Sequence, residues 1–265
     1  MEPASPLIEL PRSVLLALWL QRVGAGAEPL HRAVRAVQGD DEPHTVTDGD
    51  EALVPGAENL PDLLAAWASG PREAAAVLPA PGDVAGVPAT VSAAAVAAGE
   101  CVLVQTPLGS FAAVPGVEAF GSVFEPGHLV TWAVCRVPDW RTGMLGTIGT
   151  LPESERDLRG ALVSATEALA SLDVARWRPD AAATIASLRS DADLGGQVPP
   201  GLDGRRLRVL VTAARLRAIV ALAADDDGGA VNLWQADQRS SALREVDRAA
   251  RRAMSAATFR LDPPA

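Results

Sequence analysis

The character of the sequence changes at Gly149. Before this residue, short apolar runs typical of buried strands alternate with helix-like segments; after it, apolar residues recur only every three or four positions. The change is marked by Thr150-Leu151-Pro152-Glu153, which has the form of a helix capping box. We therefore predict an α+β fold, in which residues 1–148 form a small mixed sheet with flanking helices and residues 149–261 form an all-helical bundle. One continuous domain with two layers is the alternative.

The front half contains four strand-like runs and four helix-like segments. Residues 129–137 have the clearest strand pattern, because their β-branched and aromatic side chains suit a pleated, buried surface. The other strands are predicted at 74–78, 101–106 and 111–114, the last two joined in a hairpin by a turn that contains Pro107 and Gly109. Proline near the start or glycine after the end predicts the helices, at 11–23, 29–37, 60–68 and 89–98.

The back half shows only helical patterns, predicted at 150–172, 179–190, 207–224 and 231–259. Turn-rich connectors separate these segments, which is typical of antiparallel neighbours in a bundle. In the last segment one predicted face is apolar and consists of Leu243, Val246, Ala250, Ala253 and Ala257. Glu155–Arg159 and Asp247–Arg251 are predicted pairs one helical turn apart.

The composition excludes several classes of function. The chain of 265 residues is 48% hydrophobic, which predicts a globular fold. Its formal net charge is −10, so we expect the phosphates of nucleic acids and anionic membrane surfaces to repel it. All 23 basic residues are arginine, because the chain has no lysine. Walker-type ATPases and enzymes that use a lysine Schiff base, including those with pyridoxal phosphate, are therefore excluded. The absence of lysine and tyrosine, with abundant alanine, indicates a high-GC bacterial genome.

The cysteines and the N-terminal region predict a cytoplasmic protein. Cys101 and Cys135, the only cysteines, lie in apolar runs and are predicted to be free and buried. The apolar run at 13–20 resembles a secretion signal, but Glu2 and Glu9 remove the positive charge that such a signal needs before this run. No run reaches the length of about 18 apolar residues that spans a membrane, because arginines interrupt the closest one, at 207–224.

An acidic loop follows the second predicted helix and holds the densest set of metal-ligand types: Asp40, Asp41, Glu42 and His44. Carboxylates and imidazole bind divalent ions, so these residues are the weak candidates for a metal site. Their spacing matches no calcium loop, however, and helix capping and turn formation are the ordinary roles of such residues. We predict no tight metal site and no cofactor.

A second cluster lies at the end of the clearest strand and consists of Trp132, Arg136, Asp139, Trp140 and Arg141. Arginine beside tryptophan can stack on a planar ligand or anchor a protein contact, which makes these residues the candidates for a binding surface. The alternative is a tryptophan that closes the core beside a turn held by ion pairs.

No catalytic signature occurs in the chain, so two functions remain open. The first is a non-catalytic interaction or regulatory protein, which binds a partner protein or a second copy of itself. The second is an enzyme or small-molecule-binding protein whose pocket lies between the sheet and the helices, near residues 79–88 and the acidic loop. A deep pocket with convergent polar groups favours the second function, and an exposed apolar patch favours the first. We predict the first.

Overall fold

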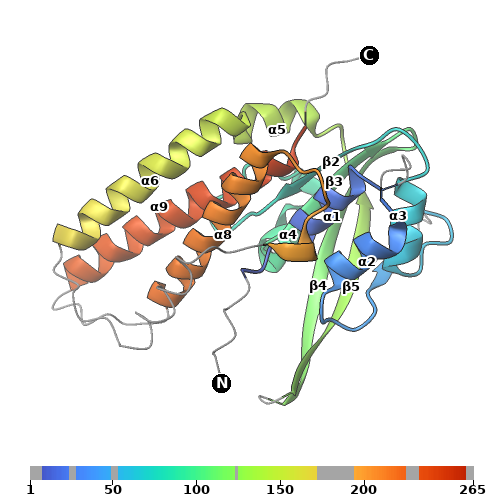
Figure 1. Cartoon of the computed structure of the whole chain (residues 1–265), viewed down its shortest axis with the longest axis horizontal. Coiled ribbons are helices and arrows are strands. Elements are labelled where there is room, and N and C mark those ends of the chain that lie inside the picture. Colours follow the sequence, from blue (N-terminus) through green and yellow to red (C-terminus); the bar gives the residue numbers. More distant parts are fainter. Residues whose placement is uncertain are drawn as a thin grey trace. The chain divides into compact units, whose positions relative to one another are not determined.

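The computed structural model describes residues 8–23, 28–48, 53–122, 125–171, 194–224 and 233–260. It confirms the α+β fold: a five-stranded mixed sheet has the order β1-β5-β4-β3-β2 (Figure 1). β1 (Thr45–Thr47) runs parallel to β5 (Glu125–Arg136). The remaining neighbours are antiparallel, and they are β4 (Gly109–Ser122), β3 (Cys101–Thr106) and β2 (Glu73–Val77).

The chain divides into two compact units. The helical unit consists of Met1–Glu9, Thr150–Gly195 and Asp203–Ala257, and the sheet unit consists of Leu10–Gly149, Gly196–Leu202 and Thr258–Ala265. The sheet unit therefore includes two short segments that lie far along the chain from its main part.

Helices cover the sheet because its strands are apolar on both faces. In β3, the four consecutive residues Cys101–Val104 are buried, which requires cover on each face. α1 (Arg12–Leu20) packs across β2, β3 and β4, and eight of its nine residues are buried. α2 (Leu30–Gln38) packs on α1, α3 (Leu60–Trp67) packs on α2, and α4 (Ser92–Ala98) contacts β4 after the short 3-10 turn Ala89–Val91.

The outer edge of β2 is closed by residues from elsewhere in the chain. The Ala76 N–H donates to the Thr258 hydroxyl at 2.8 Å, and the Ala74 carbonyl accepts from the Gln21 amide at 2.9 Å. The segment Gly196–Leu202 also contacts the main part of the sheet unit: the Gln197 carbonyl accepts a hydrogen bond from the indole N–H of Trp19 at 2.6 Å. These contacts satisfy backbone and side-chain groups that an open sheet edge leaves exposed.

The strands predicted at 111–114 and 129–137 are correct in place but too short. Their pairing continues to Ser122 and Glu125, so the glycines and prolines that indicated a loop lie in a long hairpin instead. The Phe120 ring covers its cross-strand partner Gly127, where an added Cβ would come within 2.5 Å of the ring. Such cover of a strand glycine by an aromatic ring stabilises the pairing.

Two elements were not predicted, namely β1 and α5 (Arg141–Ile148). The expected helices of the back half appear as α6 (Leu151–Ser171), α8 (Gly204–Ala224) and α9 (Leu233–Thr258), whereas the helix predicted at 179–190 lies outside the described residues. A 3-10 turn spans Gly195–Gln197. Within the described part of the chain beyond Thr150, there is no strand.

Side-chain contacts in the helical unit follow the predicted pattern. The apolar face of α9 is buried, and Arg159–Glu155 and Arg251–Asp247 pair at 2.6 and 2.7 Å. The Thr150 N–H donates to the Glu153 carboxylate at 2.8 Å, which is one half of a capping box. The other half differs, because the Thr150 hydroxyl also donates to Glu153, at 2.7 Å.

The two thiols should differ in reactivity. Cys101 is buried, and burial, reinforced by Cys135 and Glu100, raises the pKa of its thiol far above the ordinary range, whereas Cys135 is half-buried. Since the thiolate is the nucleophile, we expect iodoacetamide to label Cys135 of the folded protein well before Cys101. Mass spectrometry of the two cysteine peptides over time measures the order. Equal rates, or faster labelling of Cys101, would contradict the placement of β3 in the core.

Candidate functional site

The predicted cluster at the end of β5 is dispersed by the fold. Trp132 is fully buried and its indole N–H donates to Nδ1 of His44 at 3.1 Å. Trp140 is also buried, with its ring edge-on to Phe259 at 5.8 Å. Both rings therefore pack into the core, which agrees with the alternative of a tryptophan that closes the core.

The charged members of this cluster hold a turn together. Arg141 pairs with Asp139 at 2.6 Å and with Glu73 at 2.9 Å, and hydrogen bonds from Arg141 lower the pKa of Asp139 to about 2. Arg136 lies over the Phe111 ring, 5.2 Å from its centroid, and donates to the Leu108 carbonyl at 3.1 Å. A binding role for these two arginines stays a prediction.

Asp41 is the centre of a polar network that joins α1, the α2–β1 loop and β5. Its two oxygens accept a pair of hydrogen bonds from Arg12, Nε at 2.6 Å and Nη2 at 2.8 Å. Nε2 of His44 lies 3.2 Å from one oxygen, and Nδ1 of His128 lies 3.2 Å from the other. The network therefore attaches β5, at His128 and Trp132, to α1 and to the α2–β1 loop.

The protonation state of His44 follows from its partners. An indole N–H can only donate, so Nδ1 of His44 must accept from Trp132 and the ring must be neutral with its proton on Nε2. That proton is then donated to Asp41. Burial lowers the pKa of His44 and the Arg12 charge acts in the same sense, against the raising effect of Asp41. For Asp41, burial raises the pKa, but Arg12 and His44 together outweigh burial and lower it.

This network gives the structural roles of the four weak candidates for a metal site. Asp41 and His44 bind each other and other side chains, while Asp40 and Glu42 are exposed. Among the described residues, no three His, Cys, Asp or Glu side chains are arranged to hold a metal ion.

We accordingly expect no metal binding at micromolar concentrations at Asp40–His44, because a metal would have to displace Arg12 from Asp41. Titration calorimetry with calcium, magnesium, manganese and zinc measures this. A micromolar site that is lost in Asp41→Asn would overturn the assignment.

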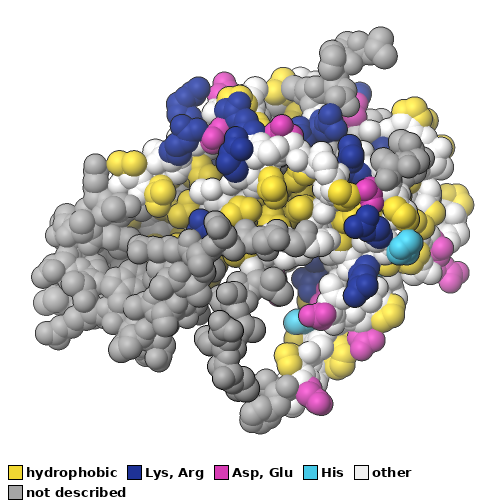
Figure 2. Space-filling view, viewed as in Figure 1, with side chains coloured by type: hydrophobic (Ala, Val, Ile, Leu, Met, Phe, Trp, Pro, Cys, Tyr) yellow, Lys and Arg dark blue, Asp and Glu magenta, His cyan; other side chains and the backbone are white. Residues whose placement is uncertain are grey.

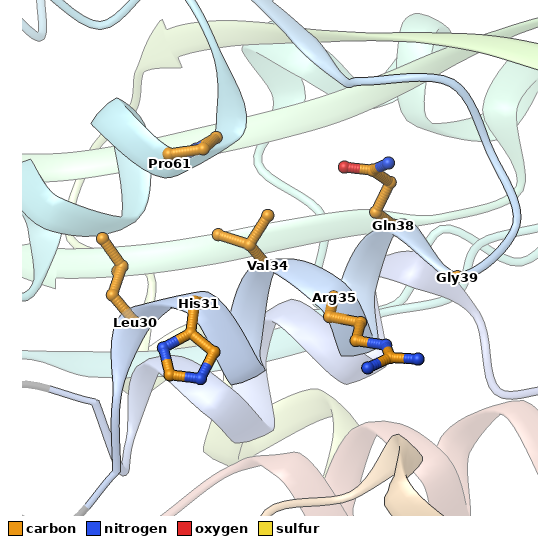
Figure 3. A pocket seen from close by; sticks show the side chains of 7 residues that line it. All are labelled: Leu30, His31, Val34, Arg35, Gln38, Gly39 and Pro61. Carbon is orange, nitrogen blue, oxygen red and sulfur yellow. The ribbon is translucent and has the colours of Figure 1, made fainter.

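A shallow groove of about 540 Å³ lies on α2, beside the N-terminus of α3 (Figure 3). Its floor is apolar, with Leu30, Val34 and Pro61, and polar side chains border it. The alternative function predicted from the sequence has its pocket between the sheet and the helices, whereas this groove lies on the surface of α2 and α3, next to the acidic loop. Its polar border consists of His31, Arg35 and Gln38.

The β4–β5 hairpin has an uncovered face. Pairing places Glu118 opposite Leu129, Phe120 opposite Gly127, and Thr131 opposite Thr45 of β1, all on one side of the sheet. We call this surface the hairpin platform and define it as Thr45, Glu118, Phe120, Leu129 and Thr131, all of which are exposed.

Two large apolar side chains stand on the hairpin platform, Phe120 at 44% and Leu129 at 47% exposure. The opposite face of the same strands is buried at Val130 and Trp132, whereas Val117, the cross-strand partner of Val130, is 46% exposed. In Figure 2 the projecting hairpin, in the lower part of the view, carries hydrophobic and acidic side chains. This surface was not predicted, because the sequence indicated strands only at 111–114 and 129–137 and not over the residues between them. The signal that could have found it is the presence of Phe120 and Phe124, two of only four phenylalanines, in this short segment.

No helix within the described ranges is long and apolar enough to cross a lipid bilayer.

Comparison with known proteins identifies the family. The family described as "Rv1486c-like protein, N-terminal domain" matches residues 13–144, and "Rv1486c-like protein, C-terminal domain" matches residues 152–255. Two relatives from Mycobacterium tuberculosis, "Uncharacterized protein Rv1486c" of strain H37Rv and "Uncharacterized protein MT1533" of strain CDC 1551, are each 33% identical over 204 residues. The aligned region covers 69% of this chain and 68% of each relative, which fits the predicted bacterial origin. No solved structure matches. The chain belongs to the Rv1486c-like protein family.

Proposed function

We propose that this protein is a non-catalytic interaction protein that binds another protein through the hairpin platform. The observation that carries the proposal is the exposed apolar surface of Phe120 and Leu129 on one face of the hairpin, whose reverse side is buried at Val130 and Trp132 and exposed at Val117. An uncovered sheet face with large apolar side chains favours association with another protein. Exposed apolar surfaces of this kind often mark the site where a partner binds. The described groove on α2 is shallow and lacks the convergent polar groups of a catalytic site.

Affinity purification with two matched variants tests the proposal. Tagged wild-type protein, the double variant Phe120→Thr/Leu129→Thr and the control Leu108→Thr are expressed in the native cells, and captured proteins are quantified by mass spectrometry. Leu108 is 67% exposed but lies in the β3–β4 turn, outside the hairpin platform, so its variant removes a similar apolar surface elsewhere. Thermal melting shows that all three chains are folded.

We expect at least one protein that the wild type and Leu108→Thr capture equally and that the double variant loses. Equal capture by all three chains would mean that the hairpin platform binds no partner.

The α2 groove favours a second candidate, a small-molecule-binding protein. Arg35 borders an apolar floor there, which suits an anionic ligand with an apolar body. Native mass spectrometry of the purified protein tests this idea. A bound small molecule that is lost in Arg35→Gln would favour the second candidate over the first.

We also propose a cytoplasmic location, which two free cysteines fit. The organisation into residues 1–148 and a helical bundle over 149–261 stays a proposal with one amendment: 196–202 and 258–260 complete the front part. The ion pairs Arg205–Glu155 at 2.7 Å and Arg217–Asp247 at 3.4 Å, which link α8 to α6 and to α9, support the bundle.

A further inference from the structure

The hydrogen-bond pattern of β4 shows which of its backbone groups face outward. The Val137 N–H donates to the Ser110 carbonyl, so Ser110 and every second residue after it bond toward β5. The residues between them point to the other side, where β3 pairs with β4 only as far as Ala113. Beyond Ala113, the outward positions are Pro115, Val117, Ala119 and Gly121.

Pro115 ends the β3 ladder because it has no N–H to donate. The three outward residues after it do have an N–H, and in the described part of the chain no hydrogen bond to these groups occurs. β2, in contrast, has its edge closed by Thr258 and Gln21, and β1 is only three residues long. The stretch of β4 from Val117 to Gly121 is therefore the long open edge of the sheet.

The side chains along this edge define the chemistry of a strand that could be added. Glu118 and Phe120 lie on the hairpin platform, and Gly116 lies two residues before Glu118 on the same face. Residues 114–131 contain two carboxylates, Glu118 and Glu125, and no arginine. A cross-strand neighbour of opposite charge is favourable beside Glu118, and apolar neighbours are favourable beside Phe120 and in the space above Gly116.

We propose that the open edge of β4 binds an extended segment of a partner protein by strand addition, and that this segment has a basic residue between two apolar residues at alternate positions. Main-chain hydrogen bonds to Val117, Ala119 and Gly121 supply affinity, and the pair with Glu118 sets the register. A second copy of this chain fits less well, because it brings the same two carboxylates and a net charge of −10 to the contact. This inference rests on the proposed function and specifies its binding mode.

Two synthetic nonapeptides with blocked ends test the inference. One has the sequence Thr-Thr-Ile-Thr-Arg-Thr-Ile-Thr-Thr, and the other has glutamate in place of arginine. Fluorescence anisotropy measures their binding to the full chain. We expect the arginine peptide to bind about fivefold more tightly than the glutamate peptide, as the size of a cross-strand charge pair suggests. The variant Glu118→Arg should reverse this order.

Proline at position 119 tests the backbone contact directly. Ala119→Pro removes an outward N–H but no hydrogen bond to β5, so the hairpin should remain paired while peptide binding falls at least tenfold. Ala119→Gly keeps the N–H and should bind like the wild type. No binding of the arginine peptide at millimolar concentration, unchanged binding in Ala119→Pro, or a dimer of the free chain by sedimentation would each overturn the inference.

The two proposals fail differently. If Ala119→Pro captures the same partner as the wild type while Phe120→Thr/Leu129→Thr loses it, strand addition is wrong and the hairpin platform still binds. If both variants capture the partner, the proposed function itself is wrong.

Discussion

A chain that ends at Ala257 should unfold at least about 10 °C below a chain that ends at Arg260. The shorter chain loses the Thr258 hydroxyl that accepts from Ala76 on the edge of β2, and the Phe259 ring that packs against Trp140. Removing a buried phenylalanine side chain costs about 3–5 kcal/mol, and a buried N–H without an acceptor costs about 1–3 kcal/mol more. Thermal unfolding followed by circular dichroism compares the two chains.

Point variants separate the two contributions. Phe259→Ala should cost several times more than Phe120→Ala, because Phe259 is 7% exposed and Phe120 is 44% exposed. Thr258→Val should destabilise the protein, whereas Thr258→Ser keeps the hydroxyl and should be close to the wild type. Equal unfolding temperatures for the chains ending at Ala257 and Arg260 would show that the sheet unit is stable without residues 258–260.

The second large effect is expected at Trp132. Trp132→Phe should lower the free energy of unfolding by about 1–3 kcal/mol more than Trp67→Phe does, because it leaves the buried Nδ1 of His44 without a donor. Trp67 is the matched control: it is equally buried, and among the described residues its indole N–H has no hydrogen-bond partner. Chemical denaturation at pH 8 measures both variants. Equal costs would contradict the Trp132–His44 hydrogen bond.

The same network predicts how stability depends on pH. Burial holds the pKa of His44 in the folded chain below its ordinary value of 6.5, so the unfolded chain takes up a proton that the folded chain does not. Above pH 6.5, His44 is neutral in both states and its titration does not change the free energy of unfolding. As the pH falls below 6.5, this free energy decreases until the pH passes below the pKa of His44 in the folded chain.

Asp41 affects stability at lower pH. Because its pKa is lowered in the folded chain, it stabilises the fold above pH 3.8, and this stabilisation is lost as the pH falls through its folded pKa. We expect Trp132→Phe to weaken the decrease below pH 6.5, because a protonated His44 no longer meets a second donor. A wild-type chain whose stability is constant between pH 7.5 and pH 4.5 would contradict the neutral state of His44.

Local signals made most of the fold predictable. α1, α2, α3 and α9 each begin and end within three residues of the predicted bounds, because prolines and glycines at their ends act locally. β1 was not predicted because it has only three residues, which lie among polar residues and carry no local strand signal. They form a strand only by pairing with β5. The outer hairpin was not predicted because Pro115, Gly116 and Gly127 are local loop signals that the pairing of β4 with β5 overrides.

The site was less predictable than the fold, for a physical reason. The spacing of Asp41 and His44 places them near each other, but Arg12 and Trp132 reach them from residues far away in the chain. For Trp132 the sequence left two interpretations open, a binding surface and a place in the core, because the side of the sheet to which it points depends on which face the helices cover. A single sequence does not give that information; the fold buries both Trp132 and Trp140.

Hydrogen exchange of the chain, alone and bound to the protein captured with it, tests the hairpin platform as the binding surface most directly. The exposed amides of the hairpin exchange quickly in the free chain, and a partner that covers them slows this exchange. We expect slower exchange in residues 116–131 on binding and no change in residues 30–39, which line the α2 groove. Protection confined to residues 30–39, with the hairpin unchanged, would contradict this expectation.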